Sequence, residues 1–290
     1  MNLLEKYKLL ANRLFLDYIL KNREKYKDFY REYVKARIPV LFESYVSMMY
    51  LTTFLVFIIS FLVVLIYMRI SIGFWHWVEW LVAVIVASVF SLSVYLYFRI
   101  YPSLKAGDLR VSIENNLPFA LLYMSALAKS GLPPQKIFEI LAKRKEFPGI
   151  KEEANYITYL TKVMGLDLIT ALIKAANTTP SRKFAEFLYS FVSTIRSGGD
   201  LKFFLEQEAK NALFEFKLKM KEFTDKLTTL LTIYTGVFIV FPLFLITLIT
   251  LFAMLINVQL FPILKLMIIT ILPLFNMSYL LLLQTYELKR

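Results

Sequence analysis

The side chains that most often carry catalysis or bind metals are scarce in this sequence. It contains no cysteine and one histidine, His76, among 290 residues. Thiolate metal sites, iron–sulfur clusters and cysteine nucleophiles are therefore excluded, and one histidine does not suffice for a histidine metal centre or a Ser-His-Asp triad. Two carboxylate pairs remain, Glu152 with Glu153 and Glu206 with Glu208, and we expect both to be solvated surface charges. The sequence predicts no catalytic residue, no cofactor and no metal ion.

A glycine-rich turn at 197–200, with the sequence SGGD, resembles a fragment of a phosphate-binding loop. It lacks the lysine spacing of the Walker motif and no strand pattern precedes it, so we interpret it as a turn between helices. His76 lies between Trp75 and Trp77, which is typical of the aromatic belt at a membrane surface. No ionisable residue falls at the middle of any long apolar stretch, whereas transporters and pumps usually keep one there.

The composition indicates that these residues belong to a membrane protein. Hydrophobic residues make up 58% of the chain, above the roughly 45–50% of a soluble domain. Four charge-free stretches are long enough to cross a bilayer, which takes about 20 apolar residues. They cover residues 44–68, 80–98, 231–256 and 266–286. We predict an all-α, polytopic membrane protein with four transmembrane helices.

The distribution of Lys and Arg predicts the orientation. Residues 1–43 hold ten of these cations, residues 99–227 hold twenty and the last two residues hold two. The loops on the other side hold only Arg69 and Lys265. Cytoplasmic loops carry the excess of Lys and Arg, so both termini and the large loop are predicted to be cytoplasmic and the protein to lie in the cell membrane.

The same pattern divides the chain into five predicted regions: a basic amphipathic N-terminal segment (1–43), a first transmembrane hairpin (44–98), a cytoplasmic helical bundle (99–230), a second transmembrane hairpin (231–286) and a cytoplasmic tail (287–290). The net charge of +12 could also indicate nucleic-acid binding, but most of it follows from this topology.

Helix start and stop signals predict six helices in the cytoplasmic insert. We expect them at about 108–130 with Asp108 as N-cap, 133–145, 150–164, 167–177 with Asp167 as N-cap, from Thr179 and Pro180 to 197, and from Asp200 without interruption into the third span. Apolar residues recur three and four apart on the first and last of these helices, which is typical of a bundle core. This core is expected to contain Leu117, Leu121, Met124, Leu127, Ala128, Leu201, Phe204, Leu205, Ala209 and Ala212.

The N-terminal segment alternates basic and aromatic residues. One face of its first helix is expected to carry Leu3, Tyr7, Leu10, Leu14 and Tyr18. Tyr26, Phe29, Tyr30 and Tyr33 follow among lysines and arginines. This pattern is typical of single-stranded nucleic-acid binding or of a helix lying on an anionic membrane surface. The neighbouring span favours the membrane surface.

Several motifs in the insert, in order, resemble a known family. ENNLP at 114–118 is followed by SGLPP at 130–134, GLD at 165–167, TTPS at 178–181 and SGGDL at 197–201. In this order they resemble the F domain of type II secretion systems, the platform family shared with type IV pili, archaella and tight-adherence pili, and archaeal members most closely. The matching positions are Asn116, Pro118, Gly131, Pro134, Gly165, Asp167, Pro180, Ser181, Gly198, Gly199 and Asp200.

The resemblance implies a six-helix cytoplasmic bundle between the second and third spans and a platform role without catalysis. Implied partners are a hexameric secretion or pilus assembly ATPase, prepilin or pilin subunits, a second copy or a sister platform subunit, and membrane lipids, with no nucleic acid. Candidates for docking the ATPase are Lys143, Arg144, Lys145, Arg182 and Lys183. Pro242 and Pro273 are candidate kinks in the last two spans. A small transporter or channel and a membrane-tethered DNA-uptake component remain as alternatives.

Overall fold

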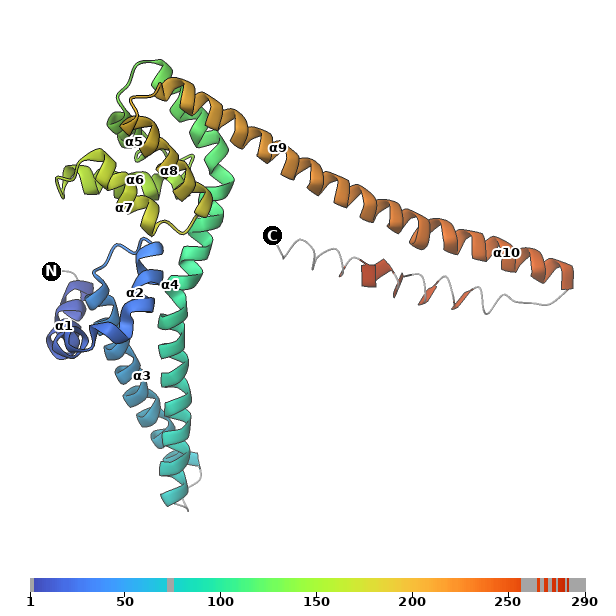
Figure 1. Cartoon of the computed structure of the whole chain (residues 1–290). Helices are drawn as coiled ribbons and strands as arrows, with labels where there is room; N and C mark the ends of the chain where they lie inside the picture. The colour runs from blue at the N-terminus through green and yellow to red at the C-terminus, as the bar shows by residue number, and fades with distance from the viewer. Residues whose placement is uncertain are drawn as a thin grey trace. The chain divides into compact units, whose positions relative to one another are not determined.

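The computed structural model describes residues 3–71, 76–256, 265–266, 269–270, 273–274, 276–279 and 281. Every regular element among these residues is helical and no strand occurs among them, which confirms the all-α prediction (Figure 1). The helices are α1 (Leu3–Lys21), the 3₁₀ turn η1 (Arg23–Tyr26), α2 (Lys27–Lys35), α3 (Phe42–Ser71), α4 (His76–Lys129), α5 (Pro134–Leu141), α6 (Pro148–Lys162), α7 (Leu168–Thr178), α8 (Arg182–Arg196), α9 (Leu201–Tyr234), the π-helix η2 (Thr235–Val240) and α10 (Phe241–Ile256).

The chain divides into two compact units, residues 1–213 and residues 214–290. Three helical stretches of the described chain are long and apolar enough to cross a membrane: Phe42–Met68, Trp80–Lys129 and Leu201–Leu255. The first two predicted spans fall within these stretches, and the third does so up to its last residue, Ile256. The fourth, 266–286, lies mostly outside the described residues.

In the first unit, α3 and α4 pack as a hairpin, and α4 continues beyond it into a bundle of shorter helices (Figure 1). The prediction of a separate helix starting at Asp108 is wrong, because α4 runs from His76 to Lys129 without a break.

Pro102 lies inside this helix and has no N–H to offer the carbonyl of Phe98. The hydroxyl of Tyr45 on α3 donates to that carbonyl at 2.7 Å and replaces the missing hydrogen bond. A helix can therefore pass through Pro102 without an unsatisfied carbonyl at that position.

The bundle surrounds one apolar core, to which α4, α5, α6, α7, α8 and α9 all contribute buried side chains. The two predicted stripes are part of it, with Leu117, Leu121, Met124, Leu205 and Ala209 buried. Leu127, Leu201, Phe204 and Ala212 pack against this core partly buried. Three- and four-residue spacing therefore identified the buried face of both helices correctly.

Most helix boundaries in the bundle lie close to the predicted ones, with one capping error. We expected Thr179 as N-cap and Pro180 as the first residue of a helix. Instead α8 starts at Arg182, and the buried hydroxyl of Ser181 accepts a hydrogen bond from Phe184 N at 3.3 Å. Thr179 ends the preceding helix α7. Ser181 is therefore the N-cap of α8, because its hydroxyl accepts a hydrogen bond from the first turn, and Pro180 lies in the connection before the helix.

The N-terminal segment packs on the base of α3. Tyr26, Phe29 and Tyr33 are buried in a cluster with Phe42 and Tyr45, with ring centroids 5.1–5.7 Å apart for the closest pairs. Helix α1 buries Ala11 and Ile19, whereas Leu10, Leu14 and Tyr18 are exposed.

In the second unit, η2 separates α9 from α10 directly before Pro242. Pro242 cannot donate a backbone hydrogen bond, and a π-turn is one of the places where helices bend, so a kink at Pro242 stays a prediction. Tyr279 Oη donates to the carbonyl of Leu230 at 2.6 Å, and its ring stacks on Tyr234 at 4.9 Å. Pro273 is helical, but its neighbours on both sides include residues outside the described ranges, so the kink predicted there stays a prediction.

Candidate functional site

Three of the motif glycines end helices in the left-handed conformation. Gly131, Gly165 and Gly198 have φ of 84°, 68° and 67°, a region that favours glycine because a Cβ atom is strained there. At the end of α4, Leu132 N donates to the carbonyl of Leu127 at 3.4 Å, and at the end of α8 Gly199 N donates to that of Thr194 at 3.0 Å. Both are the terminal bonds of a glycine C-cap.

The aspartates of the motifs start the next helices. Asp167 accepts a hydrogen bond from Thr170 N at 3.0 Å at the start of α7, as predicted. Hydrogen bonds from the side chain and from the backbone N–H of Thr170 lower the pKa of the Asp167 carboxyl. Asp200 accepts from Lys202 N at 2.9 Å and from Phe203 N at 3.4 Å at the start of α9. The SGGD turn is therefore a helix stop followed by a helix start.

Two motifs distant in sequence come together at one end of the bundle. Gly131 and Pro134 from the turn after α4, and Gly199 and Asp200 from the turn before α9, line the same cavity of about 330 Å³. The remaining motif residues lie elsewhere. Asn116 Nδ2 donates to the carbonyl of Ser112 within α4, and Pro118, Gly165, Asp167, Pro180 and Ser181 are not among the residues that line the cavity.

The first predicted docking cluster, Lys143, Arg144 and Lys145, forms the exposed loop between α5 and α6. The exposed side chain of Arg144 binds to Tyr123 on α4. Its Nε and Nη2 donate to Tyr123 Oη at 2.9 and 2.5 Å, and its guanidinium carbon lies 4.9 Å from the Tyr123 ring centroid. Arg144 therefore fixes the loop to α4, and the two lysines beside it are the cations that the loop presents.

The second predicted cluster, Arg182 and Lys183, lies on the exposed first turn of α8. Arg182 Nε pairs with Glu186 Oε1 at 2.8 Å one turn further on. The neighbouring Ser181 Oγ donates to Glu114 on α4 at 3.4 Å. Glu114 and Tyr123 are nine residues apart on α4, about 14 Å along its axis, so the structure does not bring the two basic clusters to one point.

The most buried ionic site of the described residues was missed by the sequence interpretation. Glu153, expected to be solvated, is fully buried, and its partner Arg37 has a side chain only 6% exposed. Arg37 Nη2 and Nε donate to the two Glu153 carboxylate oxygens at 2.7 and 3.1 Å, and Nη1 donates to Thr178 Oγ1 at 3.1 Å. The guanidinium carbon lies 3.7 Å from the ring centroid of Tyr156.

This ion pair fastens the N-terminal segment to the bundle, since Arg37 follows α2 whereas Glu153 and Thr178 belong to α6 and α7. Arg37 has a φ of 48°, a left-handed conformation that costs a non-glycine residue about 1–2 kcal/mol. Burial raises the pKa of Glu153, and the Arg37 guanidinium opposes this rise. The sequence offered no signal for the pair, because 116 residues separate its members and both lie among other charges.

The hydrogen bond from Tyr45 to the carbonyl of Phe98 can be tested separately. Tyr45→Phe removes the hydroxyl and keeps the ring, so it should leave the carbonyl opposite Pro102 without a donor and lower the free energy of unfolding by about 1 kcal/mol. Chemical denaturation of the full chain in detergent measures this loss. Tyr97→Phe, an exposed tyrosine of the same hairpin, is the control and should change nothing. An equal loss in both variants would show that Tyr45 does not stabilise this position specifically.

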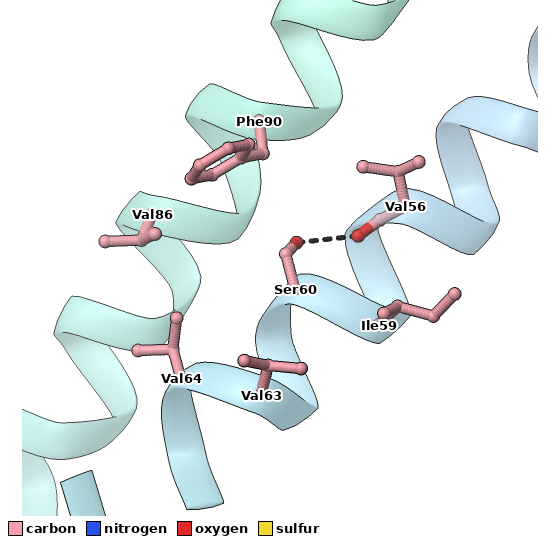
Figure 2. Close-up of a pocket in the computed structure, with 7 residues that line it drawn as sticks. All are labelled: Val56, Ile59, Ser60, Val63, Val64, Val86 and Phe90. Atoms are coloured by element: carbon pink, nitrogen blue, oxygen red, sulfur yellow. Dashed lines mark hydrogen bonds between the residues drawn. The ribbon is translucent and has the colours of Figure 1, made fainter. Parts of the chain in front are cut away.

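A second cavity, of about 240 Å³, opens between α3 and α4 in the predicted membrane region. Figure 2 shows that it is bordered by aliphatic side chains, by Phe90 and by Ser60. The Ser60 hydroxyl donates to the carbonyl of Val56 at 2.6 Å, so its proton is used within its own helix (Figure 2). This groove therefore offers no polar path for a solute. Among the described residues, no group of three or more His, Cys, Asp or Glu could hold a metal ion.

Comparisons with known proteins show what part of this chain is similar to. Residues 120–249 match the family model described as Type II secretion system (T2SS), protein F. The chain is 31% identical over 145 residues, half of its length, to the uncharacterized protein MJ1286 of Methanocaldococcus jannaschii. It is 29% identical over 117 residues, 40% of its length, to the flagella accessory protein J of Methanococcus voltae. The matches span 24% and 21% of the lengths of these relatives. No solved structure matches the chain.

Proposed function

We propose that this chain, which carries a type II secretion system protein F domain over residues 120–249, is the membrane platform of a pilus-type filament or secretion machine. In this role it couples a soluble secretion ATPase to the addition or extraction of pilin-like subunits. The observation that carries the proposal is the position of the matched region, which comprises most of the bundle and the apolar helix that follows it. The platform acts by binding and transmitting motion, not by catalysis.

The proposed function is tested by deleting the gene in its own host and counting filaments or secreted protein. We expect both to be lost and to return with the full chain. Normal filaments and normal secretion in the deletion strain would overturn the proposal.

We infer that the bundle and both termini face the cytoplasm, because 32 of the 34 Lys and Arg residues fall on the side of the N-terminal segment and the bundle. The absence of cysteine makes this testable, since single cysteines can be introduced one at a time. Lys174→Cys should react with a membrane-impermeant maleimide only after the cells are opened, whereas Ser71→Cys should react in intact cells. The reverse pattern would invert the topology.

Two observations weigh against the alternative functions. The groove of the first hairpin is apolar, while a transporter needs a polar lining within the membrane. Three of the aromatic residues that alternate with the N-terminal cations, Tyr26, Phe29 and Tyr33, are buried against α3 and cannot stack on bases. We therefore place anionic lipid or an acidic protein ahead of nucleic acid as the partner of the basic surface.

Charge reversal tests the docking clusters. Lys143→Glu with Lys145→Glu should weaken binding of the purified cognate ATPase about tenfold at low salt and less at high salt, because both side chains are exposed. Arg182→Glu with Lys183→Glu tests the other cluster in the same way. Lys174→Glu, an exposed lysine of α7, is the matched control for changed net charge. Binding that is equal in all four proteins would remove both clusters from the docking surface.

A further inference from the structure

The cavity is lined by the two motif turns, one of which follows the last residue of α4, Lys129. Figure 1 shows that this end of α4 lies beside the start of α9 and away from the α3–α4 hairpin. Arg99 is the first cation after the second predicted span, and α4 ends at Lys129. The 30 helical steps between these two residues measure about 45 Å. Lipid and the transmembrane segments of other proteins therefore cannot reach the cavity, whereas a soluble protein can.

The cavity exists because backbone turns rather than side chains form part of its wall. Gly131 has no Cβ, and no other atom lies within 4 Å of the place where one would be. Pro134 starts α5 on one side of the cavity and Gly199 precedes α9 on the other. Six apolar side chains line it as well, together with the polar Asp200 and Lys202: Ala128, Leu132, Ile137, Phe191, Leu201 and Leu205. A pocket of this kind takes up an apolar or aromatic side chain of a partner, which is the usual anchor of a protein interface.

The charges around the cavity favour an acidic partner. The two segments that form it, 128–137 and 196–210, hold five cations, Lys129, Lys136, Arg196, Lys202 and Lys210, and three anions, Asp200, Glu206 and Glu208. Lys136 pairs with a fourth anion, Glu139, at 3.1 Å, so the excess around the cavity is one positive charge. Asp200 is engaged in capping α9. Glu206 is held between Lys129 and Lys210 at 2.8 and 2.9 Å, and these two cations lower its pKa to about 2. A second copy of this chain would present the same excess of cations, so charge disfavours it as the occupant.

We propose that this cavity is where the platform receives a soluble partner, and that the partner inserts an apolar side chain flanked by carboxylates. The inference rests on the proposed function, under which the partner is the secretion ATPase. The exposed Lys202 supplies a positive charge at the cavity itself. The cavity supplies the apolar anchor point that the basic clusters alone lack.

The test blocks the cavity after folding. Lys202→Cys is the only cysteine of its variant, so the purified full chain in nanodiscs can be labelled there with a bulky maleimide. We expect the labelled protein to bind the purified ATPase at least tenfold more weakly than the same protein unlabelled. Lys174→Cys, labelled on α7 away from the cavity, should change binding less than twofold.

A second variant fills the cavity with a side chain. Leu201→Trp should weaken ATPase binding at least tenfold, and Val163→Trp, at an exposed position outside the cavity, should leave it unchanged. If the unmodified chain binds the ATPase and labelled Lys202→Cys binds equally well, the cavity is not the docking point and the inference is overturned. If the unmodified chain does not bind the ATPase at all, the proposed coupling fails and the inference fails with it.

Discussion

Arg37→Ala is expected to lower the free energy of unfolding of the 1–213 unit by about 3–5 kcal/mol, the usual cost of removing one member of a buried ion pair. The Glu153 carboxyl would remain buried without its partner, where it must either stay charged in an apolar site or take up a proton. Thr178 and Tyr156 would lose their contacts to the guanidinium as well. Chemical denaturation of the full chain in detergent measures the loss, and faster hydrogen exchange in α1 and α2 would locate it.

Two further variants separate the ion pair from the turn that carries it. Arg37→Gly adopts the observed φ of 48° without strain and should be about 1 kcal/mol more stable than Arg37→Ala, but still far less stable than the parent. Arg37→Met combined with Glu153→Leu replaces both charges by apolar groups and should recover most of the loss. If Arg37→Gly were as stable as the parent, the ion pair would contribute nothing.

The pH dependence of the Arg37→Ala loss has a definite sign. Burial raises the pKa of Glu153 above its ordinary value of 4.5, and removing Arg37 removes the main opposing influence. The folded variant then keeps a proton at pH values where the unfolded chain has lost it, so its stability falls as the pH rises above 4.5. The loss should therefore be smaller at about pH 5 than at about pH 8. Glu153→Gln added to Arg37→Ala removes the titrating carboxyl, so the double variant should not show this pH dependence.

Local features of the fold could be predicted from the sequence because they depend on neighbours along the chain. The caps at Asp167 and Asp200 and the helix stops at Gly131, Gly165 and Gly198 are all where composition and spacing placed them. The core stripes follow from periodicity, and the three apolar stretches of the described residues from their length and lack of charge. Each of these features has its physical cause in residues that are close together in the sequence.

The features that escaped prediction depend on contacts between distant segments. A helix through Pro102 is stabilised by Tyr45, 53 residues away from the carbonyl that it satisfies. Arg37 and Glu153 are ordinary charges in the sequence, and only the packing of α2 beside α7 brings them together. The shared cavity of the two glycine turns likewise forms only because α4 and α8 end where α9 begins.

Gly149→Val should be the most disruptive single substitution of a glycine in the bundle. A Cβ atom at this position would lie 2.6 Å from Ile113 N and 2.9 Å from the carbonyl carbon of Ser112, both backbone atoms of α4. A backbone cannot yield as a flexible side chain can, so α6 has to move away from α4. We expect a loss of about 3 kcal/mol in the free energy of unfolding, at the upper end for overpacking.

Gly107→Ala is the matched control, because Gly107 lies in the interior of α4 and has nothing within 4 Å of its Cβ position. There a methyl group only removes the helix penalty of glycine, so this variant should gain about 0.5–1 kcal/mol. Opposite signs for the two substitutions, measured by denaturation of the full chain, would show that the close approach of α6 to α4 decides the effect. A loss at Gly107 would mean that another surface covers this face of α4, and no loss at Gly149 would mean that α6 does not pack directly on the α4 backbone.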